Sequence, residues 1–146
     1  MNGGDLFVIA AVFSFIASLL HVATVFGGAS WYRFFGAGER MATLSESGSK
    51  RPTFITSCIA GILFIWGLYA LSGAGIIVTL PLLNAVLIVI TSIYLVRGVA
   101  GLILPFIVVH PFLSQNSIRF WLISSTICLL FGLFYLLGIL ANWNNH

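Results

Sequence analysis

The sequence predicts an all-α membrane protein, a four-transmembrane-helix bundle with a short amphipathic interfacial segment between helices one and two. Of its 146 residues, 60% are hydrophobic and only 6% are charged, whereas soluble domains carry about 25% charged residues. Four apolar runs each approach the roughly 20 residues that cross a bilayer core. The runs do not alternate apolar and polar residues, as barrel strands would. This composition excludes a soluble enzyme, a nucleic-acid-binding protein and a secreted disulfide scaffold.

The four spans are expected at Leu6–Phe26, Phe54–Leu71, Leu82–Leu104 and Phe120–Leu140, within a single integral membrane domain covering residues 1–146. The first run has no Lys or Arg before it and is longer than the 7–15 apolar residues of a signal peptide. We therefore expect a retained helix. Pro52 suits the first turn of the second helix.

The segment Trp31–Leu44 is expected to lie in the membrane interface, either as an amphipathic helix or as a re-entrant loop. On a helical wheel one face is aromatic and the other is charged or polar, which is typical of interfacial helices. The first face holds Trp31, Phe34, Phe35, Gly38 and Met41, and the second holds Arg33, Glu39, Arg40 and Thr43.

Arg97 is the most unusual residue of the third span. A charge near the bilayer centre costs about 2.5–3.5 kcal/mol on insertion scales, so it needs a partner or a route to water. If the helix runs Leu82–Leu104, Arg97 is buried. If it runs Ile77–Val96, Arg97 lies at the interface. We prefer the first placement because Pro81 makes a good helix start. The partner of Arg97 is expected to be Glu39 or a lipid phosphate.

The basic residues predict the orientation. Arg33, Arg40, Lys50 and Arg51 lie in the first loop and Arg119 in the third, whereas the other segments outside the spans hold no Lys or Arg. By the positive-inside rule both basic loops face the cytoplasm. We therefore expect a multi-pass protein of the bacterial inner membrane with both termini in the periplasm.

Histidines and cysteines give little sign of catalysis. His21 is expected to be a buried histidine hydrogen-bonded to Ser or Tyr. An alternative has His21 and His110 ligating haem or a metal. Cys58 and Cys128 form no C-x-x-C pair, and lone buried cysteines act as small hydrophobes. We therefore expect no enzyme activity, no metal and no cofactor.

Small residues recur at helical spacing in all four spans, and such stripes let membrane helices approach closely. The stripes are Ala10, Ser14 and Ser18; Thr53, Ser57 and Gly61; Ser124, Cys128 and Gly132; and Asn84, Thr91, Tyr94, Gly98 and Gly101. Since four short helices enclose little interior, we expect a homo-oligomer, either a dimer or a trimer.

Three motifs carry a resemblance: WYRFFGAGERMA, WGLYALSGAG (Trp66–Gly75) and YLVRGVAG (Tyr94–Gly101). With them the chain resembles a family of small uncharacterised bacterial inner-membrane proteins with four spans. The resemblance implies this architecture and no particular chemistry. In length and span count alone, the chain is also loosely similar to DoxX-type proteins.

Basic and aromatic residues converge on one leaflet, which favours an anionic-lipid-binding protein with a role in envelope lipid homeostasis. The expected phosphate contacts are Arg33, Arg40, Arg97 and Arg119, with Glu39 fixing the geometry and Trp31 and Tyr32 setting the depth. His21 completes the candidate site. Two alternatives stay open: a small oligomeric transporter or channel, and a haem or quinone redox protein.

Overall fold

The computed structural model describes residues 2–108 and 116–143, and this part of the chain is helical without any strand. Four of its helices are long and apolar enough to cross a membrane. The predicted all-α four-helix bundle is therefore confirmed, and the chain is a multi-pass membrane protein. The helices are α1 (Gly3–Phe34), α2 (Glu39–Glu46), α3 (Arg51–Gly73), α4 (Leu83–Ile107) and α6 (Ile118–Trp143).

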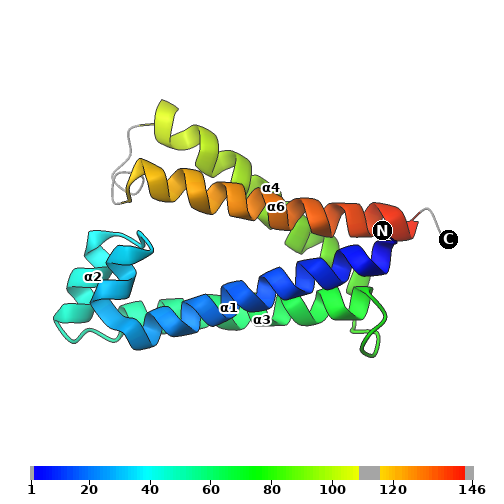
Figure 1. Cartoon of the computed structure of the whole chain (residues 1–146), viewed down its shortest axis with the longest axis horizontal. Helices are drawn as coiled ribbons and strands as arrows, with labels where there is room; N and C mark the ends of the chain where they lie inside the picture. The colour runs from blue at the N-terminus through cyan, green and yellow to red at the C-terminus, as the bar shows by residue number, and fades with distance from the viewer. Residues whose placement is uncertain (1, 109–115, 144–146) are drawn as a thin grey trace.

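The long helices form two antiparallel pairs (Figure 1). Helix α1 packs along α3, α4 packs along α6, and α1 joins the pairs by also contacting α6. The start of α1 and the end of α6 lie at one end of the molecule, which we name the terminal end. Helix α2 lies at the other end, beside the end of α1 and the start of α3, and we name this the basic end.

The core lies where the two pairs meet. Phe7, Tyr94 and Tyr135 are almost completely buried there, together with Leu87 and Ile90. Large apolar side chains also cover the outside of every long helix. In a bilayer those outward side chains contact lipid, so the bundle is held by close packing and internal hydrogen bonds rather than by the hydrophobic effect alone.

Helix α1 extends beyond its predicted end at Phe26. It is broken at Gly28, where φ is 62° and ψ is −148°, and then continues to Phe34. This backbone conformation is readily available only to glycine. Because α1 continues to Phe34, the segment predicted as amphipathic, Trp31–Leu44, is divided between the last turn of α1 and the start of α2. Between them Gly36 and Gly38 have positive φ values of 70° and 96°.

The start of α4 agrees with the preferred placement of the third span. Helix α4 begins at Leu83, shortly after Pro81, and contains Arg97. Leu82, the residue before the helix, has a left-handed φ of 54°. Helix α3 begins with Pro52 in its first turn, as expected.

The small-residue stripes differ in how deeply they are buried. Ala10, Ser14 and Ser18 are buried in the bundle, as are Gly98 and Gly101 on α4. The stripe of α3 (Thr53, Ser57 and Gly61) is instead exposed along its whole length. A Cβ atom added at Gly61 would meet nothing within 4 Å. Within the described residues, the α3 stripe therefore faces outward from the bundle.

Candidate functional site

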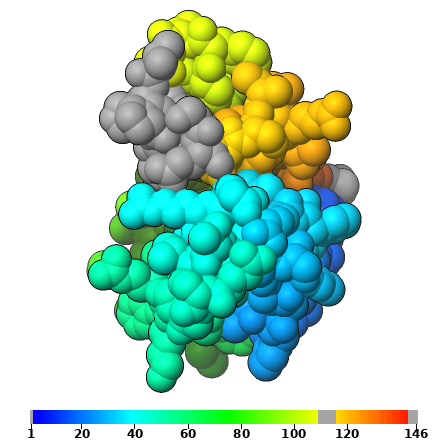
Figure 2. Space-filling view, turned by 90° about the vertical axis from the view of Figure 1, so that its left-hand side faces the viewer, coloured from blue at the N-terminus to red at the C-terminus, as the bar shows by residue number. Residues whose placement is uncertain are grey.

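Five exposed basic side chains belong to the elements of the basic end. They are Arg33, Arg40, Lys50, Arg51 and Arg119. Figure 2 views this end, with α2 and its neighbours in α1 and α3 below, and the ends of α4 and α6 above. The structure therefore brings the basic residues assigned to the first and third predicted loops to one side of the bundle, as expected when each span carries the chain across the membrane.

Arg97 lies farther into the bundle, at the seam between α4 and α6. Its side chain is half-buried. Nη1 donates to Ser125 Oγ at 3.2 Å and Nη2 donates to Ser124 Oγ at 3.3 Å. The guanidinium carbon lies 4.8 Å from the centroid of the Trp121 ring, within the range of a cation–π interaction. Both hydroxyls and the ring are neutral, so these contacts orient the positive charge without cancelling it.

The Arg97 side chain points toward the basic end. Gly98 of α4 packs against Leu129 of α6, and Gly101 packs against Ser125. The backbone of Arg97 is therefore level with the region of Leu129. Its hydrogen-bond partner Ser125 lies one helical turn nearer the basic end, and Trp121 lies two turns nearer. This is the direction in which a long basic side chain snorkels from lipid toward water.

Gly101 makes room for the guanidinium. It lies one turn after Arg97 on the same face of α4. A Cβ atom at this position would come to 2.4 Å from Arg97 Nη1 and 2.0 Å from Ser125 Oγ. The absence of a side chain at Gly101 thus allows α4, α6 and the charged group to occupy the same seam.

Arg33, Glu39 and Glu46 form an exposed ion-pair cluster, which we name the Arg33 clasp. Arg33 Nη2 lies 2.6 Å from Glu39 Oε1, and Nη1 lies 2.5 Å from Glu46 Oε1. The turn through Gly36 and Gly38 folds α2 back beside the end of α1, which brings these charges together. The expected Arg97–Glu39 pair is therefore not formed, because Glu39 binds the arginine six residues before it. The clasp likewise engages Arg33, which was expected to contact lipid phosphate.

The clasp also shifts the acidity of its carboxyl groups. Hydrogen bonds from Arg33 hold the pKa of Glu39 below its ordinary value of 4.5, and they lower the pKa of Glu46 in the same way. Both glutamates are therefore ionised at neutral pH. Since all three side chains are exposed, the clasp contributes only modestly to stability.

Trp31 and Tyr32 have different surroundings. Trp31 is 42% exposed, and its ring lies over Gly27, where a Cβ atom would come to 2.0 Å from it. Part of its ring therefore remains on the surface of the molecule. Tyr32 is only 1% exposed, and its Oη forms a 3.1 Å hydrogen bond with Thr56 Oγ1. Tyr32 thus ties α1 to α3 and presents almost no surface to a headgroup.

The remaining predicted site residues are Arg40, Arg119, His21 and His110. Arg40 is exposed on α2, and Arg119 is exposed in the first turn of α6. The Nδ1 atom of His21 lies 2.7 Å from the carbonyl oxygen of Ala17, so its partner is the backbone rather than Ser or Tyr. His110 lies outside the described residues. Over residues 2–108 and 116–143 no group of three or more His, Cys, Asp or Glu could hold a metal.

The sequence does not identify the partners of Arg97. Ser124 and Gly101 belong to predicted packing stripes, but the sequence links neither of them to Arg97, and it gives neither Ser125 nor Trp121 a role beside Arg97. The missing information is the register of α4 against α6. If α4 and α6 are paired as an antiparallel hairpin, each residue of α4 can be matched to a level on α6. If Arg97 also reaches one turn toward the membrane surface, this pairing selects Ser125 and Gly101 as its neighbours.

No family model, curated protein or solved structure matches the chain.

Proposed function

We propose that this protein binds anionic lipid in the leaflet at its basic end, with Arg97 as the residue that contacts the lipid phosphate. The observation that supports the proposal is a half-buried arginine inside a span whose described partners are two serine hydroxyls and an indole ring. A guanidinium has five N–H donors, and the described hydrogen bonds use two of them.

The acidic residues of this chain do not neutralise Arg97. The sequence contains three Asp and Glu residues in total. Asp5 belongs to the capping box at the start of α1, and both glutamates belong to the Arg33 clasp. A desolvated charge requires a counter-charge or access to water. An anion supplied by the membrane would meet this requirement.

A phosphate group fits this site by chemistry and by depth. Guanidinium groups bind phosphate oxygens in a planar, often bidentate geometry. The side chain of Arg97 points toward the basic end, where the exposed Arg40 and Arg119 add positive potential. Trp31 is exposed at the same end and suits the interfacial depth. Arg33 and Glu39 act in this proposal as a structural pair that holds α2, and they do not contact the lipid.

The wider setting of the proposal is a homo-oligomer in the bacterial inner membrane, with the basic loops in the cytoplasm and a role in envelope lipid homeostasis. The five basic residues on one side support the orientation. The exposed α3 stripe supports the oligomer, since small residues at four-residue spacing favour close helix pairing in membranes.

The test is to measure lipid retained by Arg97→Ala. The protein is reconstituted in nanodiscs of phosphatidylcholine with a minor share of phosphatidylglycerol, and native mass spectrometry counts the lipids that stay bound. A hydrogen bond to a charged group contributes about 1.5–3 kcal/mol. We therefore expect Arg97→Ala to weaken phosphatidylglycerol binding by at least about tenfold, and Arg97→Lys to weaken it less.

Arg51→Ala is the matched control, because it removes an equal charge from an exposed position at the same end. It should leave specific retention almost unchanged. Equal phosphatidylglycerol retention by wild type and a folded Arg97→Ala would overturn the proposal. An equal loss in Arg51→Ala would also overturn it, because binding would then follow net charge rather than the Arg97 site.

A further inference from the structure

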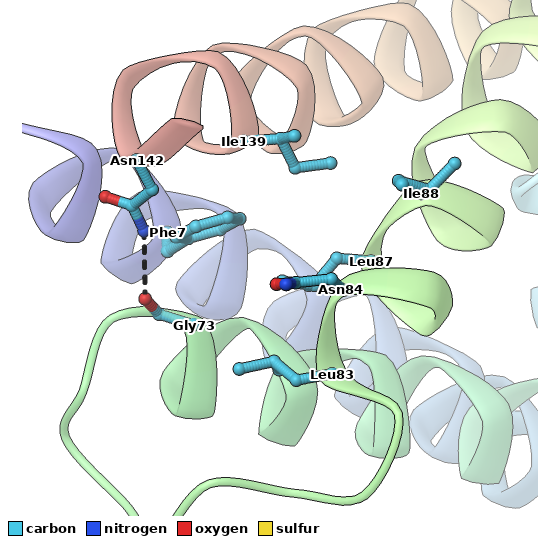
Figure 3. A pocket seen from close by; sticks show the side chains of 8 residues that line it. All are labelled: Phe7, Gly73, Leu83, Asn84, Leu87, Ile88, Ile139 and Asn142. Atoms are coloured by element: carbon cyan, nitrogen blue, oxygen red, sulfur yellow. Dashed lines mark hydrogen bonds between the residues drawn. The ribbon is translucent and has the colours of Figure 1, made fainter. Parts of the chain in front are cut away.

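A pocket opens at the terminal end, away from the basic residues. Its volume is about 220 Å³, and it lies between the start of α4, the end of α6 and the Phe7 ring of α1. Phe7 and Leu87 are buried on its inner side, and Ile88 is 48% exposed. Figure 3 shows Ile88 and Ile139 on neighbouring helices beside the pocket. The pocket thus has an apolar interior that continues to the lipid-facing surface.

None of the residues that line this pocket carries a charge. A charged headgroup would lose hydration there without gaining an opposite charge, which is unfavourable. The pocket is therefore suited to a neutral ligand. This distinguishes it from the Arg97 site, whose charge and location select an anion.

Two carboxamides supply the polar part of the pocket. Asn142 Nδ2 donates to the carbonyl of Gly73 at 3.3 Å, which joins the end of α6 to the end of α3. The Asn84 side chain points from α4 into the pocket, toward Phe7 (Figure 3). Within the described part of the chain no hydrogen bond involves the Asn84 carboxamide. Asn84 therefore offers donors and an acceptor to a ligand beside an apolar surface.

We propose that this terminal-end pocket binds the neutral, carbonyl-bearing head of a membrane amphiphile. The Asn84 N–H groups donate to the carbonyl, the head packs on Phe7 and Leu87, and the apolar tail leaves past Ile88 into lipid. Specific ligand sites combine an apolar lining with a few placed polar groups in this way. The volume admits a group the size of one ring. An isoprenoid quinone and a diacylglycerol both present this chemistry.

The test uses wild-type protein in nanodiscs and two probes, decylubiquinone and dioctanoylglycerol. Native mass spectrometry measures the amount of bound probe over a titration. Competition between the two probes then shows whether the pocket prefers the quinone or the diacylglycerol. Asn84→Leu keeps the approximate size of the side chain and removes the carboxamide. We expect it to weaken binding of the preferred probe by about tenfold. Ile88→Trp should weaken binding by blocking the mouth from an exposed position.

The control is Ser92→Leu, which changes an exposed polar residue on α4 outside the pocket. It should bind the preferred probe like wild type. Arg97→Ala should also keep this binding, so failure here is distinguishable from failure of the anionic-lipid proposal. The inference is overturned if neither probe binds wild type saturably, or if folded Asn84→Leu and Ile88→Trp bind as wild type does.

Discussion

Two tyrosines lie side by side in the core, with ring centroids 5.8 Å apart, but their hydroxyl groups differ. Tyr135 Oη donates to the carbonyl of Trp66 at 2.8 Å and forms a 3.0 Å hydrogen bond with Ser14 Oγ. Within residues 2–108 and 116–143, the buried Tyr94 Oη forms no hydrogen bond. An unsatisfied buried hydroxyl costs about 1–3 kcal/mol, whereas a satisfied one contributes about 0.5–1.5 kcal/mol.

The two Tyr→Phe variants should therefore have opposite consequences. Tyr135→Phe should lower the free energy of unfolding by about 1 kcal/mol because it breaks the links to Ser14 and Trp66. Tyr94→Phe should leave stability unchanged or raise it slightly. Unfolding in mixed micelles under increasing denaturant measures both. A Tyr94→Phe variant as unstable as Tyr135→Phe would show that the Tyr94 hydroxyl has a partner, such as Ser14 or a buried water.

At the scale of the element, the break in α1 depends on one backbone conformation. Gly28 has positive φ, and a Cβ atom added there would meet only Ser45 Oγ, at 3.9 Å. A side chain at Gly28 thus has space but is strained. A substitution at Gly28 therefore measures the free-energy cost of the backbone conformation without the added cost of a steric clash.

Gly28→Ala should lower the free energy of unfolding by about 1–3 kcal/mol, the cost of holding a non-glycine residue in a sparsely populated backbone conformation. The matched control is Ser92→Ala, at an exposed position inside α4. That variant should be neutral or stabilising, since alanine favours the helix. Thermal unfolding of both variants in one detergent makes the comparison, and equal melting temperatures would contradict the role assigned to Gly28.

The Arg33 clasp predicts that α2 loosens in acid. The folded pKa values of Glu39 and Glu46 lie below their ordinary value of 4.5. The clasp therefore contributes its full stability above pH of about 4.5, and loses it as pH falls through the folded pKa values. Protection of the α2 amides against hydrogen exchange should fall in this acidic range.

Replacing both glutamates with glutamine provides the control for the clasp. The double variant Glu39→Gln and Glu46→Gln should show, at neutral pH, the reduced α2 protection that wild type shows in acid, and it should lose this part of the pH dependence. If wild-type α2 instead loosened with a midpoint above pH 4.5, a different group would be responsible, because a depressed carboxyl pKa moves the transition to lower pH.

The sequence predicts the four membrane-spanning helices but not the way the segment between the first two is folded. Length and continuous hydropathy were sufficient to predict four spans, because a bilayer requires them. The division of Trp31–Leu44 was not predicted, because a helical wheel assumes one continuous helix. Gly36 and Gly38 have positive φ in the structure, but the sequence alone does not require this, because glycine permits positive φ without requiring it. The sequence also does not decide which arginine binds Glu39, since both Arg33 and Arg97 are available as partners.

At the scale of the molecule, the alternation of crossings determines which loops share a side, whereas the choice of neighbouring helices required the structure. The spans are apolar on most faces, so their sequence gives little indication of which face meets which partner. The pairs of α1 with α3 and of α4 with α6 follow from packing at glycines such as Gly67 and Gly98. The pocket beside Asn84 exists only once four separate segments meet.

The outward stripe of α3 leads to the last prediction, which concerns the oligomer. Cys58 is exposed on α3 and lies three residues from Gly61, so it flanks the stripe. If two protomers pair through this stripe, their Cys58 side chains come near each other. Mild oxidation of the protein in native membranes should then give a disulfide-linked dimer. Cys128 is partly buried between helices and should contribute little.

Three variants make the oligomer prediction specific. Cys58→Ser should abolish the cross-link, whereas Cys128→Ser should retain it. Gly61→Ile adds bulk where two backbones must approach, and it should reduce cross-linking several-fold while Cys58 remains in place. Because the protomer has open space at Gly61, this substitution should not unfold it. Cross-linking unchanged in Gly61→Ile would place the contact between copies on another face, and the α3 stripe would then face lipid.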